Sequence, residues 1–99
     1  ALSANDVLTS LDLSCNQIGG DGAAHIARAL LVNSTLIELN LSDNELGDAA
    51  ALRMAAALRT NQTLLALDLR GNGIIEEATR EELYSAWGSR DQSRLHLLG

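Results

Sequence analysis

The sequence contains no proline, no phenylalanine, one tryptophan, one tyrosine and one cysteine among its 99 residues. Without proline, the turns must be made by glycine, asparagine and aspartate. Because only 2% of the residues are aromatic while 46% are hydrophobic, the core must be built from aliphatic side chains and alanine. A single cysteine cannot form a disulfide within the chain, which fits a reducing compartment such as the cytoplasm.

Long apolar runs and an excess of positive charge are also missing. The apolar runs of this sequence are too short for a transmembrane helix or a signal peptide, so no membrane partner is expected. The formal net charge is −6. A surface that follows nucleic-acid phosphates needs clustered lysine and arginine, so no nucleic-acid partner is expected either.

The sequence does contain an internal repeat, in which the number of each position rises by 28 from one unit to the next. Each unit reads L-x-x-L-x-L-x-x-N-x-L/I, and the pattern is complete three times. The recurring positions are Leu8, Leu36 and Leu64; Leu11, Leu39, Leu67 and Leu95; Leu13, Leu41, Leu69 and Leu97; Asn16, Asn44 and Asn72; and Ile18, Leu46 and Ile74. A period of this length is typical of a solenoid, in which each unit buries its apolar face against its neighbours.

Each unit is predicted to form one strand and one helix, which gives an α/β fold. In Leu11-Asp12-Leu13 the two leucines alternate with a polar residue, as in a short strand with one buried face. Asn16 and its equivalents stand where the chain leaves the strand, and their amides are expected to satisfy backbone groups there. Apolar residues at helical spacing follow, namely Ala23, Ile26, Ala27 and Leu30, and then Ala51, Met54, Ala55 and Leu58. Gly19-Gly20-Asp21 and Gly47-Asp48 are expected to supply the turn and cap before each helix.

The third unit departs from this pattern. Glu76-Glu77 replaces the glycine-aspartate pair and places negative charge at the helix start, where the helix dipole favours it. Its expected apolar positions are Ala78, Leu83 and Trp87, with the last two displaced by one residue from the earlier units. Because the outer face of a terminal repeat meets water, residues 76–99 are expected to form a C-terminal cap.

Two details of this cap can be predicted. Trp87 is expected to seal the end of the core; the alternative is that Tyr84 and Trp87 form an exposed patch that docks a partner. Residues 94–97, Arg-Leu-His-Leu, are expected to form a last strand in register with the others.

The first residues match the end of a repeat. Ala1-Leu2-x-x-Asn5 corresponds to Ala29-Leu30-x-x-Asn33 and to Ala57-Leu58-x-x-Asn61 at the same period. We therefore expect the C-terminal piece of a larger protein, whose first strand has an uncovered edge that favours self-association. The expected organisation is a single domain over 1–99, with the tail of a preceding repeat (1–7), three repeats (8–35, 36–63 and 64–91) and a final strand with the C-terminal cap (92–99).

Residues 8–35 carry nearly the whole pattern L-x-x-L-x-L-x-x-N-x-I-G-x-x-G-A-x-x-I-A-x-A-L-x-x-N-x-T. The pattern resembles the ribonuclease-inhibitor-like class of leucine-rich repeats, closely over about residues 1–75 and loosely beyond. The resemblance implies a right-handed horseshoe solenoid with parallel strands on the concave face and helices on the convex face. It also implies a cytoplasmic domain that binds another protein.

The resemblance leaves the function within this class open. A sensor or regulator of the NOD-like-receptor type is the first expectation. A regulator that activates a GTPase, as the Ran activator does, and an actin-capping cytoskeletal domain of the tropomodulin type are the alternatives.

The candidate binding residues are the polar side chains that the predicted strands direct outward. Neighbouring strands lie about 4.8 Å apart, so Asp12, Asn40, Asp68 and His96 should form one line across the sheet. This surface is expected to bind a basic or polar protein; the alternative is an ordinary solvated face. The predicted contact residues are Ser10, Asp12, Glu38, Asn40, Asp68, Arg70, Arg94 and His96.

No catalytic set is predicted, and no metal or other cofactor. His25, His96 and Cys15 lack the spacing of metal ligands, and no nucleophile, base and orienting group can be combined into a site. We therefore expect that the chain is not an enzyme. Asn33 and Asn61 satisfy the glycosylation pattern, but both recur at the repeat period, which favours a structural role for their side chains.

Overall fold

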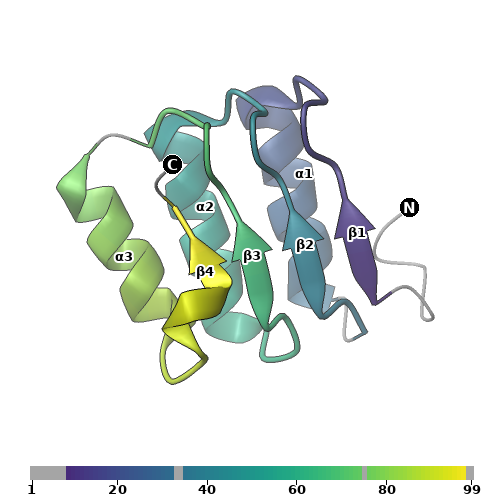
Figure 1. The fold of residues 1–99 in the computed structure, drawn as a ribbon, viewed down its shortest axis with the longest axis vertical. Helices are drawn as coiled ribbons and strands as arrows, with labels where there is room; N and C mark the ends of the chain where they lie inside the picture. The colour runs from purple at the N-terminus through teal and green to yellow at the C-terminus, as the bar shows by residue number, and fades with distance from the viewer. Residues whose placement is uncertain (1–8, 33–34, 75, 98–99) are drawn as a thin grey trace.

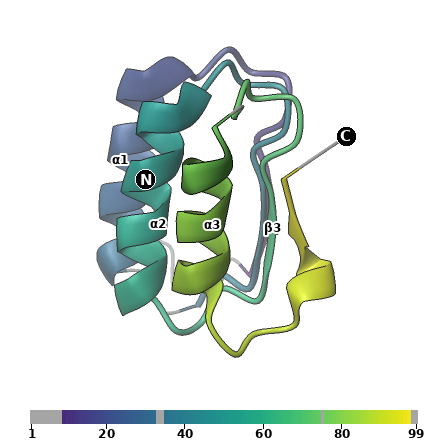
Figure 2. The same cartoon turned by 90° about the vertical axis from the view of Figure 1, so that its left-hand side faces the viewer.

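The computed structural model describes residues 9–32, 35–74 and 76–97. The elements are β1 (Ser10–Asp12), α1 (Gly19–Val32), β2 (Glu38–Asn40), α2 (Gly47–Thr60), β3 (Ala66–Asp68), α3 (Glu77–Trp87), the short 3₁₀ helix η2 (Gln92–Arg94) and β4 (Leu95–His96). The strands form one layer and the three α-helices form the other (Figures 1 and 2). Within the described ranges, no helix has the length and apolar character needed to cross a bilayer. The expected tail over 1–7 lies outside the described residues, as does Leu8.

The four strands form one parallel sheet in chain order. Leu11 pairs with Leu39, Leu39 with Leu67, and Leu67 with Leu95, so each pairing joins equivalent positions of successive repeats, as predicted. The leucines of β2, β3 and β4 are at most 5% exposed and face the helices. Strand β4 is shorter than predicted at both ends, because Arg94 belongs to η2 and the strand ends at His96, before Leu97.

Helices α1 and α2 pack on the sheet through faces rich in alanine. The predicted core positions are fully buried in both helices apart from Ile26, which is half-buried; they are Ala23, Ala27, Leu30, Ala51, Met54, Ala55 and Leu58. The helices begin at Gly19 and Gly47, one or two residues before the expected caps. Asp21 and Asp48 therefore lie within the first turn, where the helix dipole still favours their charge.

Helix α3 keeps the register of the repeat more closely than its sequence suggests. Ala78 is exposed, so its assignment to the core is wrong. The buried residue is Thr79, which lies one full repeat after Ala51 and occupies the same position on its helix. Leu83 likewise lies one full repeat after Ala55, so it is in register and not displaced by one residue. Thr79 was overlooked because it is polar.

Negative charge at the start of α3 is confirmed, since Glu76 precedes its first residue, Glu77. The Glu76 side chain makes no capping hydrogen bond. Instead, the backbone N–H of Glu76 donates to the Asp48 carboxylate at 3.1 Å, 28 residues earlier. The aspartate in the first turn of α2 thus connects two successive repeats.

Two buried asparagines tie the turns of successive repeats together, as the sequence predicted. Asn44 Oδ1 accepts from the backbone N–H groups of Asn16 at 2.8 Å and Ile18 at 3.3 Å. Its Nδ2 donates to the carbonyls of Leu13 at 2.8 Å and Leu41 at 2.9 Å. Asn72 makes the same four bonds one repeat further along the chain. These bonds satisfy backbone groups that would otherwise be buried without partners.

Asn61 plays a comparable part at the opposite end of the strands. It is 4% exposed, and its Nδ2 donates to the Leu30 carbonyl at 2.8 Å. Its Oδ1 accepts from the N–H groups of Thr63 and Leu64. These contacts confirm the structural role predicted for Asn61, whereas Asn33 lies outside the described residues.

In the turns around Asn16, Asn44 and Asn72, the residues immediately before and immediately after the asparagine have a left-handed backbone conformation. In the third repeat these residues are Gly71 and Gly73, each with φ of +69°. The equivalent residues of the first two repeats are Cys15, Gln17, Asp43 and Glu45, with φ between 51° and 58°. Residues other than glycine adopt this conformation at a cost, so these two turns are more strained than the third. Cys15 is a turn residue, as expected.

The C-terminal end of the core is closed by Trp87, which is 1% exposed. Its indole N–H donates to the Asp91 carbonyl at 2.9 Å. Trp87 lies one full repeat after the exposed Arg59, so the cap turns an outward position of the repeat into a core position. Tyr84 remains 36% exposed. The prediction that Trp87 seals the core is therefore confirmed.

Arg90 completes this cap, a role that its local sequence does not predict. Its guanidinium carbon lies 4.9 Å from the centre of the Trp87 ring. The same group donates to the carbonyls of Leu58 at 2.6 Å, Asn61 at 2.5 Å and Leu64 at 3.2 Å. Burial lowers the pKa of Arg90, because the charged form loses part of its hydration.

Replacing Arg90 with methionine is expected to lower the free energy of unfolding by about 2 kcal/mol, because three partly buried carbonyls lose their donors. Methionine retains an apolar side chain beside Trp87, so the loss reports mainly on the hydrogen bonds. The matched control is Arg59→Met, which removes only an exposed ion pair with Glu82. Urea denaturation of both variants provides the measurement. Equal and small shifts in the two would show that Arg90 does not stabilise the cap.

Candidate functional site

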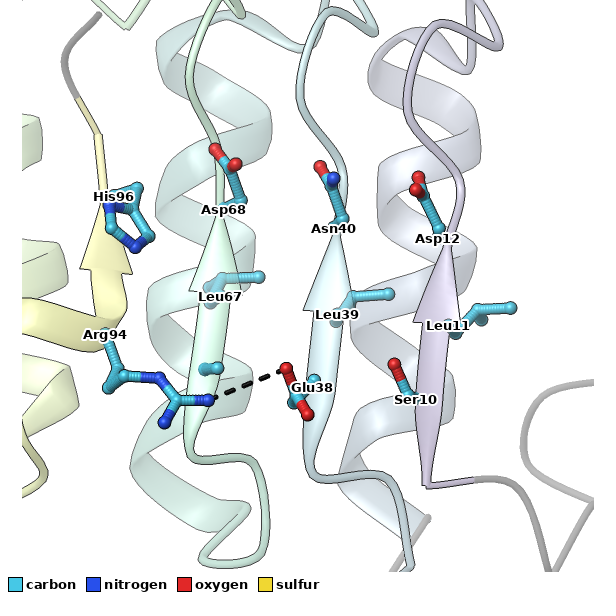
Figure 3. A pocket seen from close by; sticks show the side chains of 11 residues that line it. Ser10, Leu11, Asp12, Glu38, Leu39, Asn40, Leu67, Asp68, Arg94 and His96 are labelled. Carbon is cyan, nitrogen blue, oxygen red and sulfur yellow. Dashed lines mark ion pairs between the residues drawn. The ribbon is translucent and has the colours of Figure 1, made fainter.

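The exposed face of the sheet carries two lines of side chains (Figure 3). We call Asp12, Asn40, Asp68 and His96 the carboxyl-end row, and Ser10, Glu38, Ala66 and Arg94 the amino-end row. The pairing of the strands places the carboxyl-end row in a line across the sheet, as predicted. It also aligns Ser10, Glu38 and Ala66 of the amino-end row, and Arg94 directly precedes β4. Together the two rows line a shallow depression of ≈ 310 Å³.

The structure brings seven of the eight predicted contact residues into this depression. The exception is Arg70, which lies beyond the end of β3 and bonds back to Asp68. Ala66 lines the depression as well, although its small apolar side chain gave no reason to predict it as a contact residue.

Much of the carboxyl-end row is already bonded to the chain that follows each strand. Asp12 Oδ1 accepts from the backbone N–H of Ser14 at 2.9 Å and from its hydroxyl at 2.6 Å. Asn40 Oδ1 accepts from the same two groups of Ser42, at 3.0 Å and 2.8 Å. A hydrogen bond from the residue two positions later to an aspartate or asparagine side chain is typical of an Asx turn, which ends a strand locally.

Asp68 makes the corresponding turn with Arg70. It accepts from the backbone N–H of Arg70 at 3.0 Å, and it binds the guanidinium at 3.0 Å through Nε and at 2.6 Å through Nη2. The carboxylate side chain is only 13% exposed. Much of its charge is thus neutralised within the chain, so it is less available to a partner than the sequence suggested.

These contacts shift the acidity of the row. The pKa of Asp12 is lowered, chiefly by the hydroxyl of Ser14 and then by its backbone N–H. Burial alone would raise the pKa of Asp68, but the hydrogen bonds from Arg70 and the nearby charges of Arg70 and His96 outweigh it and lower the pKa. Both aspartates therefore stay ionised to lower pH than an isolated side chain.

Replacing Arg70 with alanine is expected to raise the pKa of Asp68 towards, or above, its ordinary value of 3.8. A carboxylate whose pKa is lowered on folding stabilises the fold fully above its unfolded pKa, and this stability is lost as the pH falls through the folded pKa. The stability difference between the parent and Arg70→Ala should therefore shrink below about pH 4.

Carboxyl ¹³C NMR titration and urea denaturation at several pH values measure the two effects. Ser93→Ala is the control, because the Ser93 hydroxyl is the main cause of the lowered pKa of Asp91. That variant should move the titration of Asp91 alone. An unchanged Asp68 titration in Arg70→Ala would contradict the assigned cause.

The amino-end row contains one ion pair that crosses a strand. Arg94 Nη2 lies 3.5 Å from Glu38 Oε2, and both side chains are about half exposed, at 48% and 55%. Arg94 reaches across β3 to Glu38 (Figure 3), and the β3 residue that pairs with Glu38 is Ala66, whose side chain is small. An exposed pair of this length contributes little to stability. The side chains of Glu38 and Arg94 can therefore leave this ion pair and bind a partner with only a small loss of free energy.

Several polar groups on this face remain available. In the part of the chain that the structure describes, Asp12 Oδ2, the Asn40 amide N–H groups and the His96 imidazole make no hydrogen bond. With Glu38 and Arg94 they offer donors and acceptors of both charges. This arrangement suits recognition of a polar protein surface. Among residues 9–32, 35–74 and 76–97 no group of three metal-ligating side chains comes together.

Comparison with protein families gives a match to the leucine-rich repeat over residues 4–27, 32–55 and 60–76. The chain belongs to the leucine-rich-repeat family. The starts of the matched segments are separated by one period of the sequence repeat, in agreement with the strand register. The finer assignment to the ribonuclease-inhibitor-like class of leucine-rich repeats stays a prediction. Comparison with curated proteins gives no match.

Two solved structures resemble this leucine-rich-repeat chain. One is the actin-binding site 2 of leiomodin-1, with 27% identity and a TM-score of 0.82 over 99% of this chain and 56% of that chain. The other is the tropomodulin C-terminal domain from Caenorhabditis elegans, with 11% identity and a TM-score of 0.77 over 98% and 57%. The second likeness shows the fold alone. The chain spans little more than half the length of either structure.

Proposed function

We propose that this leucine-rich-repeat domain binds actin in the cytoplasm through the concave face of its sheet, without catalysing a reaction. The observation that carries the proposal is the likeness to the actin-binding site 2 of leiomodin-1, which extends over 99% of the chain at 27% identity. The depression of mixed charge on the sheet supports the concave face as the contact surface.

The likeness to the actin-binding site 2 of leiomodin-1 favours this cytoskeletal function over a sensor of the NOD-like-receptor type, which was the first expectation from the sequence. The tropomodulin likeness, although it concerns the fold alone, is in keeping with it. A GTP-hydrolysis assay with a small GTPase tests the remaining alternative, a regulator of the Ran-activator type, and we expect no acceleration.

Replacing Glu38 with lysine is expected to weaken actin binding by about tenfold, because reversing a charge inside an interface costs on the order of 1 kcal/mol or more. Glu38 is suitable because it is exposed and its loss removes only the pair with Arg94. Asp68→Lys would also disrupt the turn to Arg70, so its effect on binding would be mixed with an effect on folding.

Glu81→Lys is the matched control, because Glu81 lies on α3, in the layer opposite the exposed face of the sheet. It makes the same change of charge and should leave actin binding unchanged. Sedimentation with actin filaments and fluorescence titration of actin monomers provide the measurement. No binding in either assay would refute the actin partner, and equal weakening by both variants would refute the concave face.

We also propose that, in the functional protein, a further repeat packs against the outer edge of β1. Leu11 and Leu13 are only partly buried, whereas Leu39 and Leu41, their equivalents in the next repeat, are at most 2% exposed. Asn16 is exposed, and among the described residues its Nδ2 donates only to the Ser14 carbonyl, at 3.0 Å. Its Oδ1 is thus open to two backbone N–H groups of another turn, as Asn44 and Asn72 accept two each.

This edge explains how the 99-residue chain would self-associate. Sedimentation equilibrium over a range of protein concentrations should show an apparent mass that rises above 10.5 kDa. Replacing Leu11 with lysine places a charge at this edge and should suppress that rise, because association would bury the charge. An unchanged concentration dependence in a folded Leu11→Lys variant would mean that the edge is not the contact.

A further inference from the structure

The helical layer has a groove between α1 and α2, on the side of the molecule opposite the exposed face of the sheet. Ala27 and Ala57, both buried, form part of its wall, and Leu31, which is 47% exposed, lines it as well. Arg28 enters the lining from α1 and Arg53 from α2. The groove has a volume of ≈ 210 Å³, which is room for one or two large apolar side chains.

Two alanines of the groove are replaced by larger residues at the equivalent positions between α2 and α3. Ala24, which lines the groove from α1, corresponds to Leu52 on α2 in the next repeat. Ala56, which lines it from α2, corresponds to Tyr84 on α3. Leucine and tyrosine thus occupy the second junction where the first has alanines. The small side chains of Ala24 and Ala56 help to leave this space open between α1 and α2.

The charge around the groove is opposite to that of the whole chain, which carries a formal net charge of −6. Within the described residues, neither Arg28 nor Arg53 has an ion pair or a hydrogen bond. At the second junction, by contrast, Arg59 on α2 binds Glu82 on α3 at 2.6 Å. The first junction therefore combines an apolar wall with two guanidinium groups that form no ion pair among the described residues, although Asp21 lines the adjoining depression together with Arg53.

We propose that this groove binds an acidic segment of another protein, in which one or two large apolar side chains are flanked on both sides by aspartate or glutamate. The apolar side chains fill the space left by the alanines, and their burial supplies much of the binding free energy. A guanidinium binds a carboxylate through two parallel hydrogen bonds, so an arginine on each helix selects acidic residues on both sides of the apolar ones. This surface is separate from the proposed actin-binding face.

The binding test uses the fluorescein-labelled peptide Asp-Glu-Leu-Leu-Asp-Glu and its counterpart with lysine at every acidic position. The parent chain should bind the acidic peptide saturably, with amide NMR shifts confined to α1 and α2, and should bind the lysine peptide at least tenfold more weakly. The double variant Arg28→Glu/Arg53→Glu should reverse this preference. Arg59→Glu, which changes one charge outside the groove, should preserve it.

A second variant tests the contribution of the apolar groove separately from that of the two arginine charges. Ala56→Tyr copies the residue at the equivalent position of the second junction, and Ala56 is exposed, so the fold should be retained. This variant should lose at least tenfold in affinity for the acidic peptide while both arginines remain. The proposal is overturned by unchanged binding to Ala56→Tyr, by NMR shifts on the sheet face, or by the absence of saturable binding up to millimolar peptide.

Discussion

Replacing Leu67 with aspartate is expected to leave the chain unfolded under conditions in which the parent is folded. Leu67 lies on β3 between Leu39 and Leu95 and is 1% exposed. No side chain of opposite charge faces it from the leucine and alanine core of the described residues. An unpaired carboxylate there costs several kcal/mol in addition to the lost apolar burial, which is about the whole stability of a small domain.

Leu65→Asp is the matched control, since it is the same substitution two residues earlier in the chain, at a side chain that is 47% exposed. This variant should fold with little change in stability. Circular dichroism and the dispersion of amide NMR signals distinguish the two outcomes. A folded Leu67→Asp variant would mean that the inward face of β3 has been misassigned, and with it the register of the repeat.

The sequence predicts the inner half of this fold well because the repeat carries the same requirement three times. Leu39 and Leu67 face one core in successive strands, so the same apolar side chain is required at the same position of each repeat. Asn44 and Asn72 recur because each turn leaves the same backbone groups without partners. A physical requirement that is the same in every repeat produces a periodic pattern in the sequence. Such a pattern can be recognised without a structure.

The cap is less predictable because its contacts occur once. Arg90 bonds to carbonyls of the preceding repeat, and nothing in its local sequence distinguishes it from an exposed arginine. Thr79 is buried because it keeps the register of Ala51, whereas apolar character alone pointed to Ala78. Comparison of α3 with the earlier helices position by position would have found Thr79, but not Arg90.

The candidate site was predicted in its position but not in its chemistry. Strand alternation places Asp12, Asn40 and Asp68 on the exposed face, as the structure shows. The hydrogen bonds that these side chains accept from the residue two positions later were not predicted, although the sequences Asp-x-Ser and Asn-x-Ser favour Asx turns. The pair between Arg94 and Glu38 depends on a side chain reaching across Ala66, which strand spacing does not reveal.

Replacing Asn44 with alanine is expected to lower the free energy of unfolding by about 3 to 5 kcal/mol, because several buried backbone groups lose their partners at once. Asn44 is 0% exposed. Its loss removes two acceptor contacts, from the N–H groups of Asn16 and Ile18. It also removes three donor contacts, to the carbonyls of Leu13, Leu41 and Ser42. Water has no access to replace them, so the cost is that of unsatisfied buried groups.

Asn16→Ala is the internal control for this prediction, because Asn16 occupies the same position one repeat earlier but is exposed. Within the part of the chain that the structure describes, its side chain makes one hydrogen bond, to the Ser14 carbonyl, so the loss should stay near 1 kcal/mol or below, on the order of one ordinary hydrogen bond. Urea denaturation of the two variants gives the comparison. If these asparagines stabilise the solenoid by connecting successive repeats, the two losses of unfolding free energy must differ by at least about 2 kcal/mol. Equal losses would assign the role of asparagine to its own turn and not to the contact between repeats.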